Sequence, residues 1–376
     1  MELMGGAMNI AERLIETGGR PSGFDYLRLG LALLVVISHS IVTSYGSEVT
    51  DRVWATPIGP VFRCILPLFF ALSGFLVAGS LERCKTVGGF LGLRIIRIYP
   101  ALVVEVILSA FILGPIMTTI PLGDYFTHPL FFSYLWNVIG HVHFFLPSVF
   151  DGNPCPKLVN GQLWTVPFEL ACYVAIAALA ILGRKRLKIV VLLGTLALMT
   201  LGLAVQVYKH GLQLPEYGTT LPGVFFVFSF LGGVNIYLYR NVIPFTKTVF
   251  AIAVSVMLLC AWRTDIGAFG IAFPAAYVAA YVGLTNAPRI GLLKGADYSY
   301  GIFLYHFAIQ QTLVATIPFA REWYWNLALT IPLASAFAAL SWHVVEKPAL
   351  GLRKVVFDWE AGCLDTLKRL RVQPEL

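Results

Sequence analysis

The sequence has 376 residues, of which 58% are hydrophobic and only 12% are charged, and its formal net charge is +7. Soluble domains usually carry about 25% charged residues, so this composition argues against a soluble globular enzyme, a disordered chain and a nucleic-acid-binding domain. A basic protein this apolar is typical of a membrane protein whose Lys and Arg side chains face the cytoplasm and anionic lipid.

The N-terminal region does not have the pattern of a cleaved signal peptide. Residues 1–23 contain several charged side chains and no apolar core precedes Leu27. We therefore expect residues 1–23 to form a cytoplasmic N-terminal segment, with a short amphipathic helix over residues 9–17.

Ten segments have the length and composition of membrane-spanning helices, which need about 20 mostly apolar residues. They are residues 27–46, 60–80, 98–118, 162–182, 189–207, 221–239, 249–263, 268–285, 298–318 and 324–345. The pattern predicts an all-α, multi-pass membrane protein with about ten transmembrane helices. The transmembrane domain is expected over residues 24–346, followed by a cytoplasmic C-terminal tail over 347–376.

The distribution of basic residues predicts the orientation of these helices. With the N-terminus inside, most of the 27 Lys and Arg residues fall in the connections on the cytoplasmic side, as the positive-inside rule requires. An even number of crossings then places both termini in the cytoplasm. The one long outer connection, residues 119–161, is too apolar for a free linker, and we expect it to pack back over the outer face.

The six cysteines are scattered along the chain, and no Cys-x-x-Cys or Cys/His cluster has the spacing of a zinc site. We interpret them as packing residues and expect no metal.

Ionisable residues within spanning helices are costly and are therefore candidates for function. Arg28 and His39 are eleven residues apart in one apolar segment, so a helix places them on the same face and ~16 Å apart along its axis. The alternative is that Arg28 anchors the helix to the inner surface and that His39 is a packing histidine.

Glu169 is the expected partner of His39. If the segment 162–182 enters from the outside near Gln162, both side chains lie roughly 10–12 Å below the outer surface. A carboxylate beside an imidazole raises its basicity and fixes its tautomer, as a general base requires. Each residue could instead be satisfied by a different neighbour.

Arg94 and Arg97 share a helix face at the inner side and are followed by Tyr99 and Pro100. Two guanidinium groups so placed could bind phosphate, or they could anchor the helix to anionic lipid. Gly74, next to Ser73 in the middle of the segment 60–80, would allow close helix packing. His306, ~12 Å from the cytoplasmic side, could line a passage or bond to a neighbouring helix.

These pieces, in this order, resemble the membrane-bound acyltransferase-3 family over nearly the whole chain. The matching segments are Phe24 to Arg28 with His39, Phe69 to Phe75, Arg94 to Pro100, Gly161 to Glu169, Ser299 to His306, and Glu346-Lys347-Pro348. The last usually reads Glu-Arg-Pro in the family. The sequence of the segment from Asn160 to Glu169 is most similar to that of family members that O-acetylate bacterial exopolysaccharide, lipopolysaccharide or lipo-oligosaccharide.

The resemblance implies a multi-pass protein of the bacterial inner membrane that transfers an acetyl group from cytoplasmic acetyl-CoA, or another acyl-CoA, to a carbohydrate or lipid-linked carbohydrate. His39 would then be the general base or a transient acyl carrier, and Glu169 would orient it. Arg28, Arg94, Arg97 and Tyr99 would bind the donor, and Ser73, Trp164 and His306 would line the substrate passage. The alternative is a transporter or flippase of a polysaccharide intermediate that uses His39 and Glu169 as a proton relay.

Overall fold

The computed structural model describes residues 8–19, 21–183, 186–210, 223–262, 266–291 and 295–372. Its regular structure over these residues is helical, and the only extended pairings there are isolated bridges. The α-helices are α1 (Ile10–Glu16), α2 (Gly23–Tyr45), α3 (Ser47–Trp54), α4 (Gly59–Arg83), α5 (Val87–Leu108), α6 (Gly114–Met117), α7 (Leu122–Thr127), α8 (Pro129–Leu135), α9 (Val166–Gly183), α10 (Leu187–His210), α11 (Val224–Leu238), α12 (Lys247–Trp262), α13 (Ala272–Gly283), α14 (Ser299–Thr316), α15 (Trp323–Ser341), α16 (Lys347–Gly351) and α17 (Arg353–Val372).

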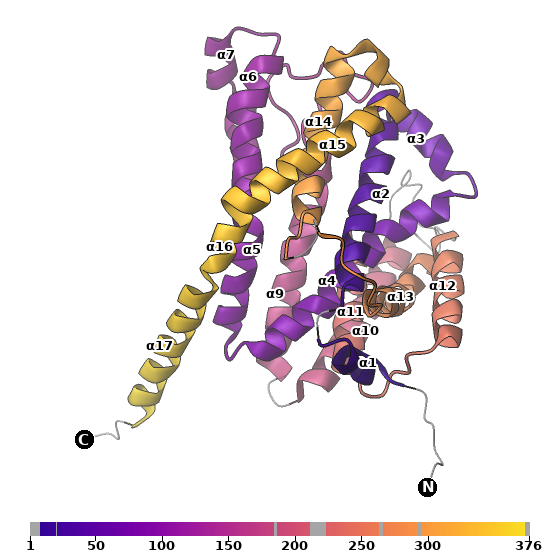
Figure 1. Ribbon diagram of the computed structural model, residues 1–376, viewed down its shortest axis with the longest axis vertical. Coiled ribbons are helices and arrows are strands. Elements are labelled where there is room, and N and C mark those ends of the chain that lie inside the picture. The colour runs from indigo at the N-terminus through magenta and orange to yellow at the C-terminus, as the bar shows by residue number, and fades with distance from the viewer. Residues whose placement is uncertain are drawn as a thin grey trace.

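Shorter helical turns complete the fold. The 3-10 turns are Trp136–Ile139, Gly161–Thr165, Ile266–Ile271 and Pro318–Arg321, and the π-helical turns are Ser109–Leu113 and Trp342–Glu346. Figure 1 shows α1 and α17 at the same end of the molecule, with α3, α6 and α7 at the opposite end. Helices α15, α16 and α17 follow one another along a diagonal path across the bundle.

All ten predicted segments contain a helix, but the described residues hold six helices that are long and apolar enough to cross a membrane. These are Gly23–Tyr45, Gly59–Arg83, Val87–Met117, Gly161–Gly183, Leu187–Tyr208 and Trp323–Cys363. Helices α11, α12 and α13 have only 15, 16 and 12 residues. The all-helical membrane fold is therefore supported, whereas the count of about ten crossings and the cytoplasmic position of the termini stay predictions.

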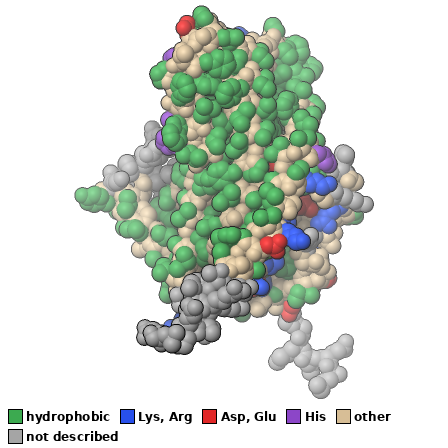
Figure 2. All heavy atoms as spheres, turned by 90° about the vertical axis from the view of Figure 1, so that its left-hand side faces the viewer, with side chains coloured by type: hydrophobic (Ala, Val, Ile, Leu, Met, Phe, Trp, Pro, Cys, Tyr) green, Lys and Arg blue, Asp and Glu red, His purple; other side chains and the backbone are tan. Residues whose placement is uncertain are grey.

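The molecular surface has the apolar composition expected of a protein surrounded by lipid. The face in Figure 2 is covered by hydrophobic side chains over most of its height, and the charged side chains visible there gather toward the lower end. Exposed apolar residues of α10, such as Leu193 and Leu201, would be costly in water and are favourable against lipid.

The contact between α4 and α11 depends on two glycines. A Cβ atom added to Gly74 would lie 1.9 Å from the carbonyl oxygen of Phe230, and one added to Gly233 would lie 2.0 Å from that of Ala71. Backbone atoms of the two helices therefore touch where side chains would keep them apart. The prediction that Gly74 permits close helix packing is confirmed.

The long connection over residues 119–161 packs against the helices, as predicted. Gln311 of α14 donates hydrogen bonds from Nε2 to the carbonyl oxygens of Cys155 and Leu158, both at 2.7 Å. Asn153 donates to the carbonyl oxygen of Gln311 at 2.9 Å, and the Asn160 amide donates to the Glu105 carboxylate of α5. The connection is thus held from inside the bundle by buried polar groups.

Candidate active site

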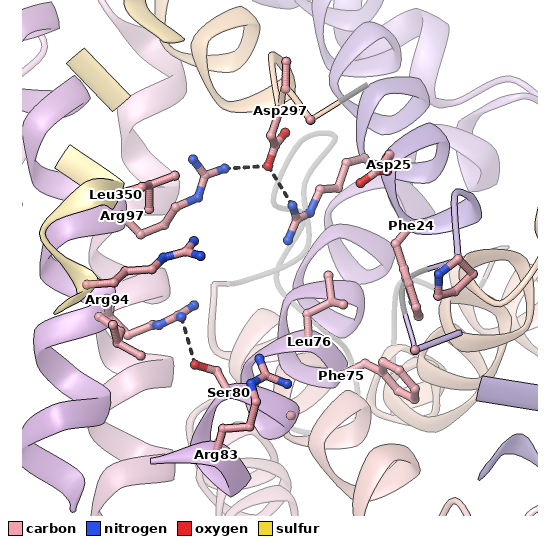
Figure 3. Close-up of a pocket in the computed structure, with 18 of the residues that line it drawn as sticks. Phe24, Asp25, Phe75, Leu76, Ser80, Arg83, Arg94, Arg97, Asp297 and Leu350 are labelled. Carbon is pink, nitrogen blue, oxygen red and sulfur yellow. Dashed lines mark hydrogen bonds and ion pairs between the residues drawn. The ribbon is translucent and has the colours of Figure 1, made fainter. Parts of the chain in front are cut away.

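A cavity with a volume of about 1080 Å³ lies at the end of the molecule that carries α1 and α17 (Figure 3). Its walls come from the segment after α1 and from α2, α4, α5, α16 and α17. Six arginines line it: Arg28, Arg83, Arg94, Arg97, Arg289 and Arg353. The acidic lining residues are Asp25 and Asp297. The cavity is therefore strongly cationic and suited to a polyanionic ligand.

Asp297 holds two of these arginines in place. Its carboxylate accepts hydrogen bonds from Arg28 at 2.7 Å and from Arg97 at 2.6 Å (Figure 3). Burial alone would raise the pKa of Asp297, but the two guanidinium groups and the Ser299 hydroxyl lower it to about 2. The carboxylate is therefore ionised at neutral pH and fixes both guanidinium groups on one side of the cavity.

Glu346 fixes Arg97 from a second direction. Arg97 donates to Glu346 at 3.0 Å, and this carboxylate, 1% exposed, also accepts from the hydroxyl of Ser341 at 3.1 Å. The π-helical turn Trp342–Glu346 directly precedes Pro348, whose ring has no N–H and clashes with the carbonyl four residues earlier. The backbone of the Glu346-Lys347-Pro348 segment thereby points the carboxylate of Glu346 into the bundle.

Arg94 is held differently. It donates to the hydroxyl of Ser80 at 3.1 Å, and its guanidinium lies 5.8 Å from the ring centre of Phe90 and 5.9 Å from that of Tyr173. Its Nε is buried and has no hydrogen-bond partner among the described residues. Arg94 is thus a positioned cation that is only partly satisfied by the protein.

A second, narrower cavity of about 110 Å³ continues from the first toward the middle of the bundle. The two share Arg28, Arg94 and Arg97 as lining residues. Ser73, Glu169 and Phe303 line the narrow part, together with Tyr173, whose hydroxyl donates to Glu169 at 2.6 Å. The combination is a wide cationic chamber with a narrow extension.

His39 and His306 line neither cavity and are linked to the narrow one through Phe303, which lines it and precedes His306 on the same helix face. Nδ1 of His39 is 2.7 Å from Nε2 of His306, and Nδ1 of His306 is 2.9 Å from the carbonyl oxygen of Phe303. A carbonyl oxygen only accepts, so Nδ1 of His306 carries a proton and Nε2 of His306 accepts from Nδ1–H of His39. This assignment leaves Nε2 of His39 with a free lone pair, as a base requires.

The structure does not form the expected pair of His39 with Glu169. The partner of His39 is His306, and Glu169 instead accepts from Tyr173 and shares the narrow cavity with Arg28. The physical reason is the packing of α14 against α2, which brings His306 to the position expected for Glu169. Gln162, near the start of the segment that holds Glu169, is fully buried and donates to the carbonyl oxygen of Leu304 in α14 at 2.6 Å.

The model of the acyltransferase-3 family, described as an acyltransferase domain, matches residues 22–344. The chain belongs to the acyltransferase-3 family. Nodulation protein 10 of Rhizobium leguminosarum bv. viciae is 28% identical over 361 residues, covering 90% of this chain and 95% of the relative. The O-acetyl transferase of Shigella phage Sf6 is 27% identical over 335 residues, covering 86% and 94%. No solved structure matches the chain.

The other predicted site residues of this acyltransferase fall into two groups. Arg28, Arg94 and Arg97 line both cavities, and Ser73 lines the narrow one. Tyr99 and Trp164 do not line either cavity. Tyr99 packs partly buried against the main core, and Trp164 packs against the rings of Phe168 and Phe226, so neither contributes a wall to the two cavities.

Two residues of the acyltransferase site were missed in the sequence. Asp297 lies in a loop and Glu346 at the end of a predicted helix, and both are distant in sequence from the arginines that they bind. Their signal was the rarity of acidic residues near the membrane interior, which could have marked them as partners of buried cations. Within the described residues no group of three or more His, Cys, Asp or Glu side chains could hold a metal ion.

Proposed function

We propose that this acyltransferase moves an acetyl group from acetyl-CoA to a sugar hydroxyl of an exported polysaccharide, lipopolysaccharide or lipo-oligosaccharide. The observation that carries the proposal is the cationic chamber with its narrow extension, whose lining residue Phe303 contacts the His39–His306 pair through its carbonyl oxygen. The relative named as an O-acetyl transferase supports transfer of an acetyl group to an oxygen acceptor.

The chamber suits the nucleotide end of an acyl-CoA. That end carries phosphates, and Arg28, Arg94 and Arg97 offer guanidinium groups at the junction of the two cavities. The acyl-bearing arm of coenzyme A is long and thin, and we place it in the narrow extension, whose lining residue Phe303 contacts His306. The donor therefore approaches from the end that holds α1 and α17, which the distribution of basic residues assigns to the cytoplasm.

His39 is proposed as the general base. Its Nε2 accepts the proton of the acceptor hydroxyl as the hydroxyl oxygen attacks the thioester carbonyl carbon. The new C–O bond forms, the C–S bond breaks, and the thiolate of coenzyme A leaves and is protonated. His306 orients His39 and keeps the proton on Nδ1. Direct transfer does not pass through an acyl-histidine. Transfer through a transient acyl-histidine is the alternative, and single-turnover experiments distinguish the two routes.

Glu169 is proposed to act on the donor side rather than on His39. It lines the narrow cavity with Arg28, Arg94 and Arg97, where a carboxylate balances the guanidinium charges when no donor is bound. The acceptor, a carbohydrate or lipid-linked carbohydrate, would reach His39 from the other side of the membrane or from within it. The protein would reside in the bacterial inner membrane.

The test uses purified protein, acetyl-CoA labelled in the acetyl group, and surface polysaccharide from a host that lacks the gene. Label on the sugar supports the proposal, and His39→Ala should lower transfer by at least 10²-fold while the protein stays folded in detergent. Normal transfer by this variant would refute the mechanism. Movement of a glycan across vesicles without acetylation would instead support the transporter alternative.

A further inference from the structure

The C-terminal helices form one wall of the cationic chamber. Leu350 of α16 and Arg353 and Phe357 of α17 line it. These three residues are spaced three and four apart, so they lie on one side of a continuous helical path. All of them follow residue 344, where the match to the family ends. The wall therefore lies beyond the segment that the family model matches.

A buried carboxylate fixes α17 to the start of α5. Oε1 of Glu360 accepts from the backbone N–H of Thr86 at 2.5 Å and from its hydroxyl at 2.8 Å, and Glu360 is only 3% exposed. The Thr86 hydroxyl in turn accepts from the N–H of Gly89 at 3.0 Å. The carboxylate satisfies the N–H of Thr86 at the helix start, the Thr86 hydroxyl satisfies that of Gly89, and the negative charge interacts favourably with the helix dipole.

Glycines of α5 allow α17 to approach closely. An added Cβ would lie 2.5 Å from Oε1 of Glu360 at Gly89 and 2.9 Å from the side chain of Val356 at Gly92. At Gly88 it would lie 3.0 Å from the ring of Trp359. The sequence of α5 thus forms a flat surface on which α17 is seated over two turns.

The lining residues of this wall differ from the inner arginines in exposure. Arg353 and Phe357 are exposed, whereas Arg94 and Arg97 are half-buried. The thioester arm must enter first, because the thioester has to reach His39. The nucleotide end, with its phosphates and its purine, then stays at the mouth, where Arg353 and Phe357 lie.

We propose that α17 is a donor-binding element: Arg353 binds a phosphate at the nucleotide end of the acyl-CoA, Phe357 packs beside the purine, and Glu360 positions both by fixing the helix to Thr86. The inference rests on the proposed function, since it requires an acyl-CoA in the chamber. Arg suits this role because its planar guanidinium pairs with phosphate oxygens in a bidentate manner.

The experiment measures binding of acetyl-CoA to the detergent-purified full chain by calorimetry, and acetyl transfer in parallel. Arg353→Ala should weaken binding and raise the KM for acetyl-CoA by about tenfold, as expected for loss of one charged contact, with kcat changed less than twofold. Lys354→Ala is the matched control: Lys354 is the adjacent exposed cation and does not line the chamber. The affinity of Lys354→Ala for acetyl-CoA, and its KM for acetyl-CoA, should equal those of the wild type.

Glu360 is tested as a positioning residue. Glu360→Ala should raise the KM for acetyl-CoA as Arg353→Ala does, while Glu360→Gln, which keeps an acceptor oxygen for Thr86, should stay near the wild type. A merely structural role would lower stability and kcat without a selective effect on donor KM.

The outcomes separate this inference from the proposed function. Unchanged acetyl-CoA binding in Arg353→Ala, or an equal effect of Lys354→Ala, overturns the role of α17 and leaves the proposed function standing. Wild-type protein that binds acetyl-CoA but acetylates no glycan contradicts the proposed function, while binding by the variants still decides the inference. Absence of acetyl-CoA binding to the wild type overturns both.

Discussion

In the proposed mechanism, the two histidines act together as one general base. His306 is fully buried, and its Nδ1 is committed to the backbone of its own helix, so its Nε2 can only accept. Nε2 of His39 is therefore left with its lone pair free. A histidine partner fixes the tautomer of His39 without adding a negative charge. A carboxylate partner would add a negative charge and would raise the basicity of His39 more strongly.

His306→Ala should lower kcat by about 10- to 100-fold, because His39 loses the acceptor that fixes its orientation and tautomer. The KM for acetyl-CoA should not change, since His306 does not line the donor chamber. His306→Gln places an oxygen near the position of Nε2 and should recover part of the activity. Steady-state kinetics of both variants provide the measurement. A Gln variant no better than Ala would argue against the orienting role.

Asp297 should make the chamber sensitive to acid. Its pKa in the folded protein is about 2, below the ordinary value of about 3.9, so its ion pairs stabilise the fold fully above pH 4 and are lost as the pH falls toward 2. Asp297→Asn should lower the free energy of unfolding at pH 7 by on the order of 2 kcal/mol. Thermal unfolding in detergent at pH 7 and pH 3 measures this. The gap between variant and wild type should narrow at pH 3, and a gap independent of pH would contradict the assignment.

At the scale of elements, the helices with a clear apolar pattern were predicted well, and their polar contacts were not. The segments 27–46, 60–80 and 324–345 coincide closely with α2, α4 and α15, because hydropathy is a local property. The segment 162–182 also matches the apolar helical stretch Gly161–Gly183, but the burial of the polar residue Gln162 was not predicted. Its hydrogen bond to Leu304 is a tertiary contact that no local pattern contains.

The α4–α11 contact offers a direct test of packing. Gly74→Ala should destabilise the protein by at least about 1–3 kcal/mol, since the added methyl meets a backbone carbonyl that cannot move aside. Gly30→Ala is the control, because nothing lies within 4 Å of a Cβ at this α2 position. Alanine there should be neutral or slightly stabilising. The melting temperatures of the two variants in detergent decide the question, and equal values would contradict the close approach.

At the scale of the whole molecule, the cation cluster was predictable and its counter-ions were not. Arg28, Arg94 and Arg97 stand out in an apolar sequence, and they do lie together around one chamber. Which acidic residues hold them depends on how α14 and the π-helical turn before Pro348 approach α2 and α5. The same holds for the His39–His306 pair, which joins residues 267 positions apart.

The arrangement of the ends also predicts the topology. Helices α7 and α17 lie at opposite ends of the molecule (Figure 1), and the distribution of basic residues predicts that the end with α17 faces the cytoplasm. In a variant without the native cysteines, Gly123→Cys should react with a membrane-impermeant maleimide in cells whose outer membrane has been made permeable. Gly362→Cys should react only after lysis. Both positions have room for a side chain, as nothing lies within 4 Å of an added Cβ.

The orientation of the protein in the membrane decides whether the proposed donor can reach the cationic chamber. If Gly362→Cys reacts in unlysed cells, the cationic chamber opens away from the cytoplasm, where acyl-CoA is made, and the donor assignment fails with it. If the two positions react as predicted, the chamber faces the donor pool, and the narrow extension carries the acetyl group toward His39 inside the membrane region. The acceptor then needs only to present a hydroxyl from the other side, so donor and acceptor meet without either crossing the bilayer.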